Sequence, residues 1–316
     1  ESKSDFNNIS HYGLDSLCNQ IEKSNADIVL NGIAGSSGLL PSISTLKSKK
    51  DLALANKESM VMAGKLINKL AIDNNVKILP VDSEHSAIFH LLENCRPEHL
   101  DEIILTASGG AFRDYTFEQL KTVTFKDALQ HPTWSMGDKI TIDSASMANK
   151  GLEVIEAAML FNLPKEKIKV LIHPQSYVHS IIRKSDMSMY AQISSPDMCL
   201  PIQNALLYPE LEKVNSTFLD LANKQLTFSK PDYSKYKMLE LAYKALEKGE
   251  AYHIAYNATN EVLVDLFIKD KIQFLDIPMY TERVLDQKLI NKLETIEDIL
   301  GLDSYIRDIT LKIVGN

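Results

Sequence analysis

The chain has 316 residues, of which 45% are hydrophobic and 24% charged, as in an ordinary globular protein with room for two or three domains. Its net charge of -8 and scattered basic residues argue against a nucleic-acid partner. Apolar runs fall short of the ~20 residues that a membrane span needs, so no membrane partner is expected. The cysteines, Cys18, Cys95 and Cys199, are odd in number and scattered, which predicts reduced thiols in a reducing compartment.

The first eighty residues alternate between helical and strand-like patterns. Helices are expected over 14–24, for about ten residues from Pro41, and from 57 to about 73. Short apolar strands are expected over 27–31, 52–55 and 77–81. This alternation predicts a parallel sheet with helices on its faces. Each strand runs into a polar or Gly-rich turn, and ligands of such sheets bind beyond the carboxyl ends of the strands.

The rest of the chain is less regular at first and then helical. Further strands are expected over 102–107, 139–142, 168–173 and 188–193. The segment 111–138 has little periodicity, which favours a functional lid because long structureless loops are uncommon in compact domains. A polar, irregular stretch follows Pro209, and residues 236–316 have the apolar spacing of a terminal helical bundle.

The stretch from Asp143 to Glu156 reads as a helix start, with Ser144 or Ser146 able to cap its first turn. Asn149, Lys150 and Glu153 then share one face of that helix, and Glu156 follows on the same face. Gly151 costs such a helix about 1 kcal/mol relative to alanine, which the close approach of a ligand or another backbone could justify. The plain alternative is a capped amphipathic helix with its charges in water.

Carboxylates on separate segments make a candidate metal site. Asp82 and Glu84 lie two apart directly after a strand, so both can point to one face. Such a pair is usually a solvated turn, but with Glu153 it supplies three hard oxygen ligands, which suit Mg²⁺ or Mn²⁺ better than Zn²⁺.

Hydroxyls, an amide and an ammonium make a candidate anion cradle. Its members would be Ser108, Ser144, Asn149 and Lys150. In the expected lid, His131 is either a proton donor or a surface histidine, and Trp134 and Met136 either cover a flat cofactor ring or pack in the core. His173 and His179 are expected to pack near the sheet, and Lys57 needs an anionic partner. Together these features predict a divalent-metal enzyme that acts on a phosphorylated sugar.

The order of the motifs resembles a known family. They are L-A-L-A-N-K-E-S (52–59), L-P-V-D-S-E-H (79–85), A-S-G-G-A-F-R (107–113), H-P-T-W-S-M-G (131–137), the 143–156 stretch, H-P-Q-S (173–176) and P-D-M (196–198). The set resembles 1-deoxy-D-xylulose 5-phosphate reductoisomerase over essentially the whole chain. The resemblance implies an NADPH- and metal-dependent enzyme of the non-mevalonate isoprenoid pathway. It would rearrange 1-deoxy-D-xylulose 5-phosphate, by retro-aldol cleavage and re-aldolisation, and reduce the product to 2-C-methyl-D-erythritol 4-phosphate.

The resemblance also implies roles for individual residues. The metal Mg²⁺ or Mn²⁺ would be held by Asp82, Glu84 and Glu153. Catalysis would rest on Lys150, His131 and Glu153. The substrate would contact Ser83, Glu84, Ser108, His131, Trp134, Ser144, Asn149, Lys150 and Glu153. NADPH would lie near Ala34, Gly35, Ser36, Asn56, Lys57, Glu58, Met136 and Gly137.

The expected fold class is α/β, with an incomplete Rossmann-like parallel-sheet domain first. The expected divisions are that domain (1–80), an α/β catalytic domain (81–208) with a lid loop over about 109–138, a linker (209–232) and a C-terminal helical bundle (233–316). The family implies a homodimer in the bacterial cytoplasm, or in a plastid-type organelle if a targeting segment has been removed.

One departure from the family leaves other interpretations open. The glycines at 32, 35 and 38 do not form the dinucleotide fingerprint, and the family's N-terminal G-S-T-G-S-I-G turn, with its flanking strands, is missing from the 316 residues. We therefore expect an N-terminally truncated reductoisomerase that binds metal and sugar phosphate but NADPH weakly or not at all. The alternatives are a metal-dependent sugar-phosphate aldolase or isomerase without nicotinamide chemistry, and a non-catalytic truncated paralogue.

Overall fold

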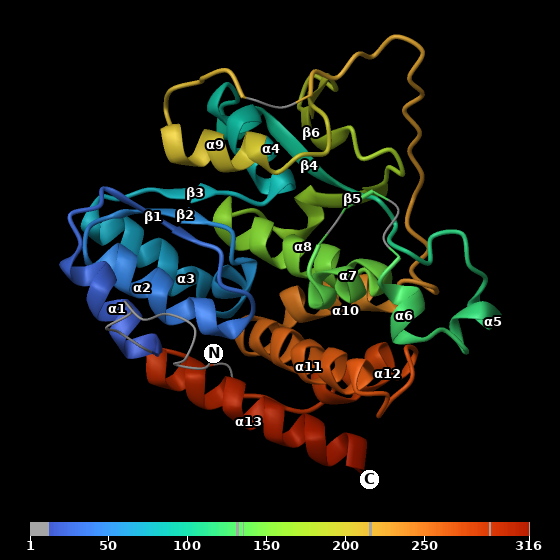
Figure 1. Ribbon diagram of the computed structural model, residues 1–316. Helices are drawn as coiled ribbons and strands as arrows, with labels where there is room; N and C mark the ends of the chain where they lie inside the picture. Colours follow the sequence, from blue (N-terminus) through green and yellow to red (C-terminus); the bar gives the residue numbers. More distant parts are fainter. Residues whose placement is uncertain (1–12, 131–132, 135, 215–216, 291, 316) are drawn as a thin grey trace, which may run out of the picture.

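The computed structural model describes residues 13–130, 133–134, 136–214, 217–290 and 292–315. Its first layer is a parallel sheet in the order β1-β2-β3, which confirms the predicted alternation. The strands are β1 (Ile28–Asn31), β2 (Asp51–Leu54) and β3 (Ile78–Pro80). The accompanying helices are α1 (Leu14–Lys23), η1 (Ser36–Gly38), α2 (Leu39–Lys47) and α3 (Lys57–Asn74), and they gather around the sheet at one end of the molecule (Figure 1).

A second sheet of four strands has the order β5-β4-β6-β7. Its members are β4 (Leu100–Ala107), β5 (Ile168–Ile172), β6 (Val178–Lys184) and β7 (Met189–Ile193). β4 pairs with β5 in parallel and with β6 in antiparallel orientation. The predicted strands 102–107, 168–173 and 188–193 are confirmed. β6 was not anticipated, because its first five residues are all buried and give no alternation of apolar and polar side chains.

The strand predicted over 139–142 is wrong, because these residues lie in α7 (Asp138–Ser146). Lys139, Ile140, Thr141 and Ile142 alternate like a strand, but the helix gives Lys139 an ion pair with Asp143 at 2.8 Å. It also buries Ile142 in a core cluster with Ala145. Tertiary packing thus overrides the local pattern.

The stretch 143–156 is two helices rather than one. Met147 adopts a left-handed conformation with φ 63° and separates α7 from α8 (Ala148–Leu160). Ser144 therefore lies in the last turn of α7 and caps nothing at the start of α8. Ser146 does act there, since its hydroxyl oxygen accepts a hydrogen bond from the amide of Ala148 at 3.2 Å.

The C-terminal region is helical, as predicted, and forms a bundle below the sheets (Figure 1). Its helices are α10 (Lys237–Lys248), α11 (Glu250–Ile268), α12 (Asp276–Leu285) and α13 (Ile296–Gly315). α8 lies centrally and packs against both α3 and α10. A Cβ atom on Gly151 would meet the Tyr256 hydroxyl at 2.3 Å and Ala242 Cβ at 2.8 Å. The helix thus carries glycine because a tyrosine from α11 packs against it.

The remaining elements connect these layers. They are α4 (Ser83–Glu93), η2 (Pro97–His99), α5 (Phe117–Leu120), α6 (Phe125–Ala128), η3 (Lys165–Lys167) and α9 (Cys199–Leu207). The expected lid segment contains α5 and α6, each begun by a threonine capping box. Phe112, Leu120 and Ala128 anchor this segment in the core. Among the described residues, no helix is both long and apolar enough to span a bilayer.

Candidate active site

Three carboxylates from two separate segments converge at the centre of the molecule. Asp82 follows β3 and caps α4, its side chain accepting a hydrogen bond from the amide of Glu84 at 3.3 Å. Glu153 lies in the middle of α8 and is 1% exposed. One oxygen from each of Asp82, Glu84 and Glu153 lies within 4.8 Å of the others. Oxygen donors at this spacing fit a hard divalent cation.

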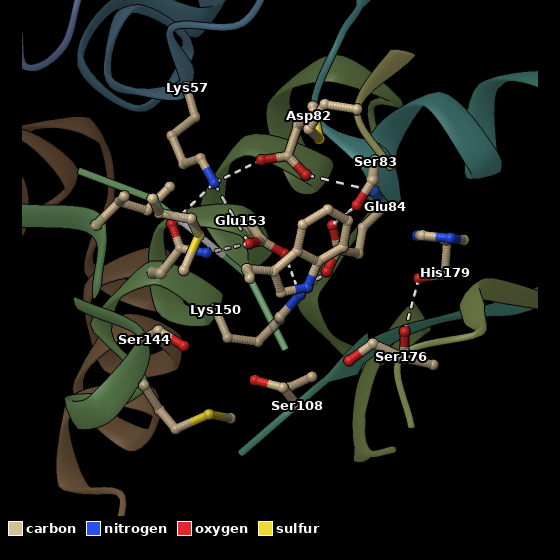
Figure 2. Close-up of a pocket in the computed structure, with 18 of the residues that line it drawn as sticks. Lys57, Asp82, Ser83, Glu84, Ser108, Ser144, Lys150, Glu153, Ser176 and His179 are labelled. Atoms are coloured by element: carbon tan, nitrogen blue, oxygen red, sulfur yellow. Dashed lines mark hydrogen bonds and ion pairs between the residues drawn. The ribbon is translucent and has the colours of Figure 1, made fainter. Parts of the chain in front are cut away.

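Two buried ammonium groups, those of Lys57 and Lys150, pair with these carboxylates (Figure 2). Lys57 Nζ lies 2.5 Å from Asp82 Oδ2 and 3.3 Å from Glu153 Oε1. Lys150 Nζ lies 2.7 Å from Glu84 Oε1 and forms a second ion pair with Glu153. Like charges so close together are costly unless cations separate them, so the site is built to hold positive charge.

Burial and neighbouring charges separate the carboxylates in acidity. Burial, together with the charge of Glu84, raises the pKa of Glu153 from 4.5 to about 6. Burial also opposes the ionisation of Asp82, but Lys57 outweighs it and holds the pKa of Asp82 well below its ordinary value. Burial disfavours the charged form of Lys150 as well, yet Glu153 and Glu84 raise its pKa. Lys150 is therefore a fixed positive charge at neutral pH.

A second polar layer lies behind the carboxylates. His85 Nε2 lies 3.0 Å from the backbone oxygen of Glu153, and His85 Nδ1 lies 3.4 Å from Glu156 Oε2. Burial alone would lower the pKa of His85, but the carboxylates of Glu156 and Asp82 outweigh this effect and raise the pKa from 6.5 to about 9. His85 thus joins α4 to α8 directly behind the carboxylates. Its place in the motif L-P-V-D-S-E-H was the available signal in the sequence.

A cavity of about 290 Å³ opens beside the carboxylates. From the expected residues, it brings together Lys57, Asp82, Ser83, Glu84, Ser108, Trp134, Met136, Ser144, Asn149, Lys150 and Glu153. Asn149 connects α3 and α8 in the cavity wall: its side chain lies 2.9 Å from Lys57 Nζ of α3 and 2.5 Å from Glu153 Oε1 of α8. Hydroxyl, amide and ammonium groups on one wall give the cavity the donors that an oxyanion needs.

Ser176, His179 and Met198 also line the cavity, and the sequence did not identify them as site residues. Ser176 and His179 face the pocket from the side opposite α8 (Figure 2). The His179 ring lies edge-on to the Trp134 ring, with the centroids 6.4 Å apart. His179 had been expected to pack near the sheet, and it does follow the start of β6. The motifs H-P-Q-S and P-D-M were the available signal.

Several expected cofactor residues lie outside this cavity lining. They are Ala34, Gly35, Ser36, Asn56, Glu58 and Gly137. Asn56 caps α3 through the amide of Ser59 at 2.9 Å, and its side chain donates to the backbone oxygen of Gly35 at 2.8 Å. Glu58 lies 3.2 Å from Lys139 Nζ, and Gly137 precedes the first turn of α7. His131 lies outside the described residues.

The two α/β layers, the carboxylate centre and the donor-lined cavity define a class of protein: a metal-dependent enzyme for a small anionic substrate. Models of one family match three segments of the chain. The 1-deoxy-D-xylulose 5-phosphate reductoisomerase model matches residues 1–64, that family's C-terminal domain model matches 78–161, and a DXP reductoisomerase C-terminal domain model matches 193–309. The chain belongs to the 1-deoxy-D-xylulose 5-phosphate reductoisomerase family.

Individual relatives agree with this assignment. A 1-deoxy-D-xylulose 5-phosphate reductoisomerase from Clostridium perfringens is 47% identical over 297 residues, which cover 94% of this chain and 77% of the relative. The Phocaeicola vulgatus enzyme is 48% identical over 318 residues, covering 100% of this chain and 82% of the relative.

Solved structures share the fold. A DOX-P reductoisomerase in complex with NADPH, fosmidomycin and magnesium superposes with a TM-score of 0.90 and 38% identity, over 96% of this chain and 79% of that one. The Zymomonas mobilis enzyme in complex with NADPH gives 0.89 and 39%, over 96% and 78% of the two chains.

Proposed function

We propose that the central cavity is where this chain carries out the reaction of its family. That reaction is the rearrangement of 1-deoxy-D-xylulose 5-phosphate and its NADPH-dependent reduction to 2-C-methyl-D-erythritol 4-phosphate. The observation that carries the proposal is the meeting of Asp82, Glu84 and Glu153 within 4.8 Å, next to a wall of phosphate-type donors. A metal and a sugar phosphate would thus be held side by side.

The metal would be Mg²⁺ or Mn²⁺, held by Asp82, Glu84 and Glu153. The donor set fits the ion, because three carboxylates here are balanced by ammonium groups at 2.5–3.3 Å, which occupy the place of a cation. When bound, the ion would supply a positive charge that polarises the substrate's carbonyl and hydroxyl oxygens.

The chain's own residues would bind and orient the substrate. Ser108, Ser144, Asn149 and Lys150 face the cavity and would donate hydrogen bonds to the phosphate. Ser176 would extend this cradle from the opposite side. Lys150 stays protonated because Glu153 and Glu84 raise its pKa, so it would stabilise negative charge that develops on substrate oxygens.

The lid and proton-transfer roles would fall on Trp134, which lines the cavity, and on His131 of the same sequence segment. Ser83 and Glu84 would contact the sugar oxygens, and Trp134 would exclude water from them. His131, which the sequence places in the same H-P-T-W segment, would donate to a substrate oxygen as the lid closes. Lys150, His131 and Glu153 are the catalytic residues that we propose.

NADPH would approach from the side of the first sheet. Lys57 and Met136 line the cavity, so the nicotinamide would lie against them, with Gly137 close by. Ala34, Gly35, Ser36, Asn56 and Glu58 would surround the adjoining part of the cofactor. The parallel sheet supports this placement, because the turns after β1 and β2 lie at the carboxyl edge, where such sheets bind ligands.

The domain divisions and the oligomer follow the same proposal. Residues 1–80 would form the cofactor part, 81–208 the catalytic part and 233–316 the helical part, joined by 209–232. A homodimer would use the edge strand β7, where Met189 is 49% and Tyr190 48% exposed, since exposed apolar edges invite pairing. The reduced cysteines and the bacterial relatives support the cytoplasm as the compartment.

A paired assay tests the proposed function. NADPH absorbance and 1-deoxy-D-xylulose 5-phosphate consumption are followed together in the presence of Mg²⁺. Glu153→Gln is expected to lower kcat/KM by at least about 100-fold, because it removes a charged ligand. Glu166→Gln, at an exposed glutamate in η3, is the matched control and should retain full activity. Substrate loss without NADPH oxidation would favour the aldolase or isomerase. If Glu153→Gln changes neither turnover nor the calorimetric binding of Mg²⁺ and sugar phosphate, the non-catalytic paralogue is favoured.

A further inference from the structure

A second polar cluster, separate from the metal centre, ties the C-terminal helices to the turn after β1. Glu261 of α11 accepts a hydrogen bond from the amide of Ser36 through Oε1 at 3.1 Å. Arg307 of α13 donates from Nη2 to Glu261 Oε2 at 2.6 Å and to the Ser36 hydroxyl at 3.2 Å. These contacts bridge 225 and 271 residues of sequence, and the metal and phosphate chemistry makes no use of them.

The same turn is also held from the side of α3. The Asn56 amide donates to the backbone oxygens of Ile33 at 2.6 Å and Gly35 at 2.8 Å. Gly35 has φ +72°, and a Cβ there would meet Glu261 Oε1 at 3.0 Å. The backbone of the turn is therefore clamped between α3 on one side and the α11–α13 pair on the other.

Charge fixes the α11–α13 side of this clamp. The Glu261 carboxylate accepts from the amide of Ser36, the first residue of η1, and a hydrogen bond to a charged acceptor is stronger than one to a neutral acceptor. Arg307 is shared between Glu261 and Asp303, whose Oδ2 lies 2.7 Å from Arg307 Nε. The Glu261 side chain is 12% exposed and that of Arg307 28%. The pair is thus partly shielded from solvent and holds its geometry better than a surface pair.

We infer that Glu261 and Arg307 are positioning residues for cofactor binding. They hold residues 33–38 in the conformation that faces NADPH, so the helical bundle contributes to cofactor affinity without touching the cofactor. A site held in its bound shape before the ligand arrives avoids the entropy of ordering it. The inference rests on the proposed function only in placing NADPH beside this turn.

The test compares Glu261→Ala with Glu261→Gln. The alanine variant removes the acceptor for the Ser36 amide, whereas glutamine keeps a carbonyl oxygen in its place. Glu261→Ala is expected to bind NADPH about tenfold more weakly in a fluorescence titration, because one charged hydrogen bond is worth about that factor. Its KM for NADPH should rise while kcat and the KM for the sugar phosphate stay unchanged. Glu261→Gln should recover most of the affinity.

Amide hydrogen exchange gives a readout independent of activity. Exchange over residues 35–38 should accelerate in Glu261→Ala and remain slow in Glu261→Gln. Asp265→Ala is the matched control, since Asp265 is an exposed residue of the same helix that pairs with Lys269 at 2.6 Å. It should change neither the exchange nor the NADPH affinity.

Two results would overturn the inference in different ways. If Glu261→Ala speeds exchange but binds NADPH like the unaltered chain, the clamp is structural only and the proposed function stands. If the unaltered chain gives no NADPH signal in the titration, the role of the clamp in cofactor affinity fails. Mg²⁺-dependent binding and consumption of the sugar phosphate then test the rest of the proposed function separately.

Discussion

Lys57 is expected to act as a substitute cation in the metal-free protein, and Lys57→Met tests this. Its ammonium lies 2.5 Å from Asp82 Oδ2 and 3.3 Å from Glu153 Oε1 and is buried with them. Removing one partner of a buried ion pair costs about 3–5 kcal/mol. We expect the lower end, about 3 kcal/mol of unfolding free energy, because Lys150 still neutralises Glu153.

The same substitution should tighten metal binding. A divalent ion relieves the repulsion that Lys57→Met leaves behind, and recovery of about half the lost energy gives roughly tenfold higher Mg²⁺ affinity. Urea unfolding with chelator measures the stability, and calorimetric titration measures the affinity. Lys65→Met is the control from the same helix, since its pair with Glu250 involves a lysine side chain that is 74% exposed and is worth less than about 1 kcal/mol. Unchanged stability together with unchanged Mg²⁺ affinity would refute the substitute-cation role.

Two further predictions concern protonation and packing. Burial raises the pKa of Glu153 from 4.5, its ordinary value, to about 6 in the folded protein. Without metal, protonation of Glu153 therefore stabilises the fold fully below about pH 4.5, and this stabilisation is lost as the pH rises through 6. Mg²⁺ affinity should therefore climb between about pH 5 and 7 and level off above, with proton release in calorimetry only on the acid side; a flat profile would contradict the raised pKa. Gly151→Ala should destabilise the protein by about 1–3 kcal/mol, because its Cβ would meet Tyr256. Gly301→Ala, which meets nothing within 4 Å in α13, should stabilise it by up to about 1 kcal/mol in thermal unfolding.

Much of the fold could be predicted because the first sheet has short apolar strands separated by clear helical runs. The segment 139–142 was misread, since K-I-T-I suits a strand until Asp143 and Ala145 supply helical partners. β6 was missed for the opposite reason: its leading residues are buried on both faces and show no period. In both segments tertiary packing, rather than the local sequence pattern, determines the secondary structure.

The site was predictable to a similar extent. Spacing predicted that Asp82 lies beside Glu84 and Asn149 beside Glu153. The first prediction assumed an extended segment, whereas Asp82 caps α4 and Glu84 lies in its first turn; the second holds because both residues share a face of α8. Spacing could not foresee that Lys57 would lie between Asp82 and Glu153, since that depends on how α3 packs against α8. Nor did spacing place Ser176 and His179 in the cavity. Ser176 lies in the turn before β6, and His179 lies in the buried start of β6, where apolar and polar residues do not alternate.

α8 carries a mechanical consequence. Its first turns face the cavity, while the rest of the helix is wedged between α3 and α10. Protein interiors are packed as densely as organic crystals and yield little to pressure. Any tilt of α8 on filling the cavity must therefore displace α3 and α10 as well. Ligand binding in the cavity would in this way shift the helices of the C-terminal bundle.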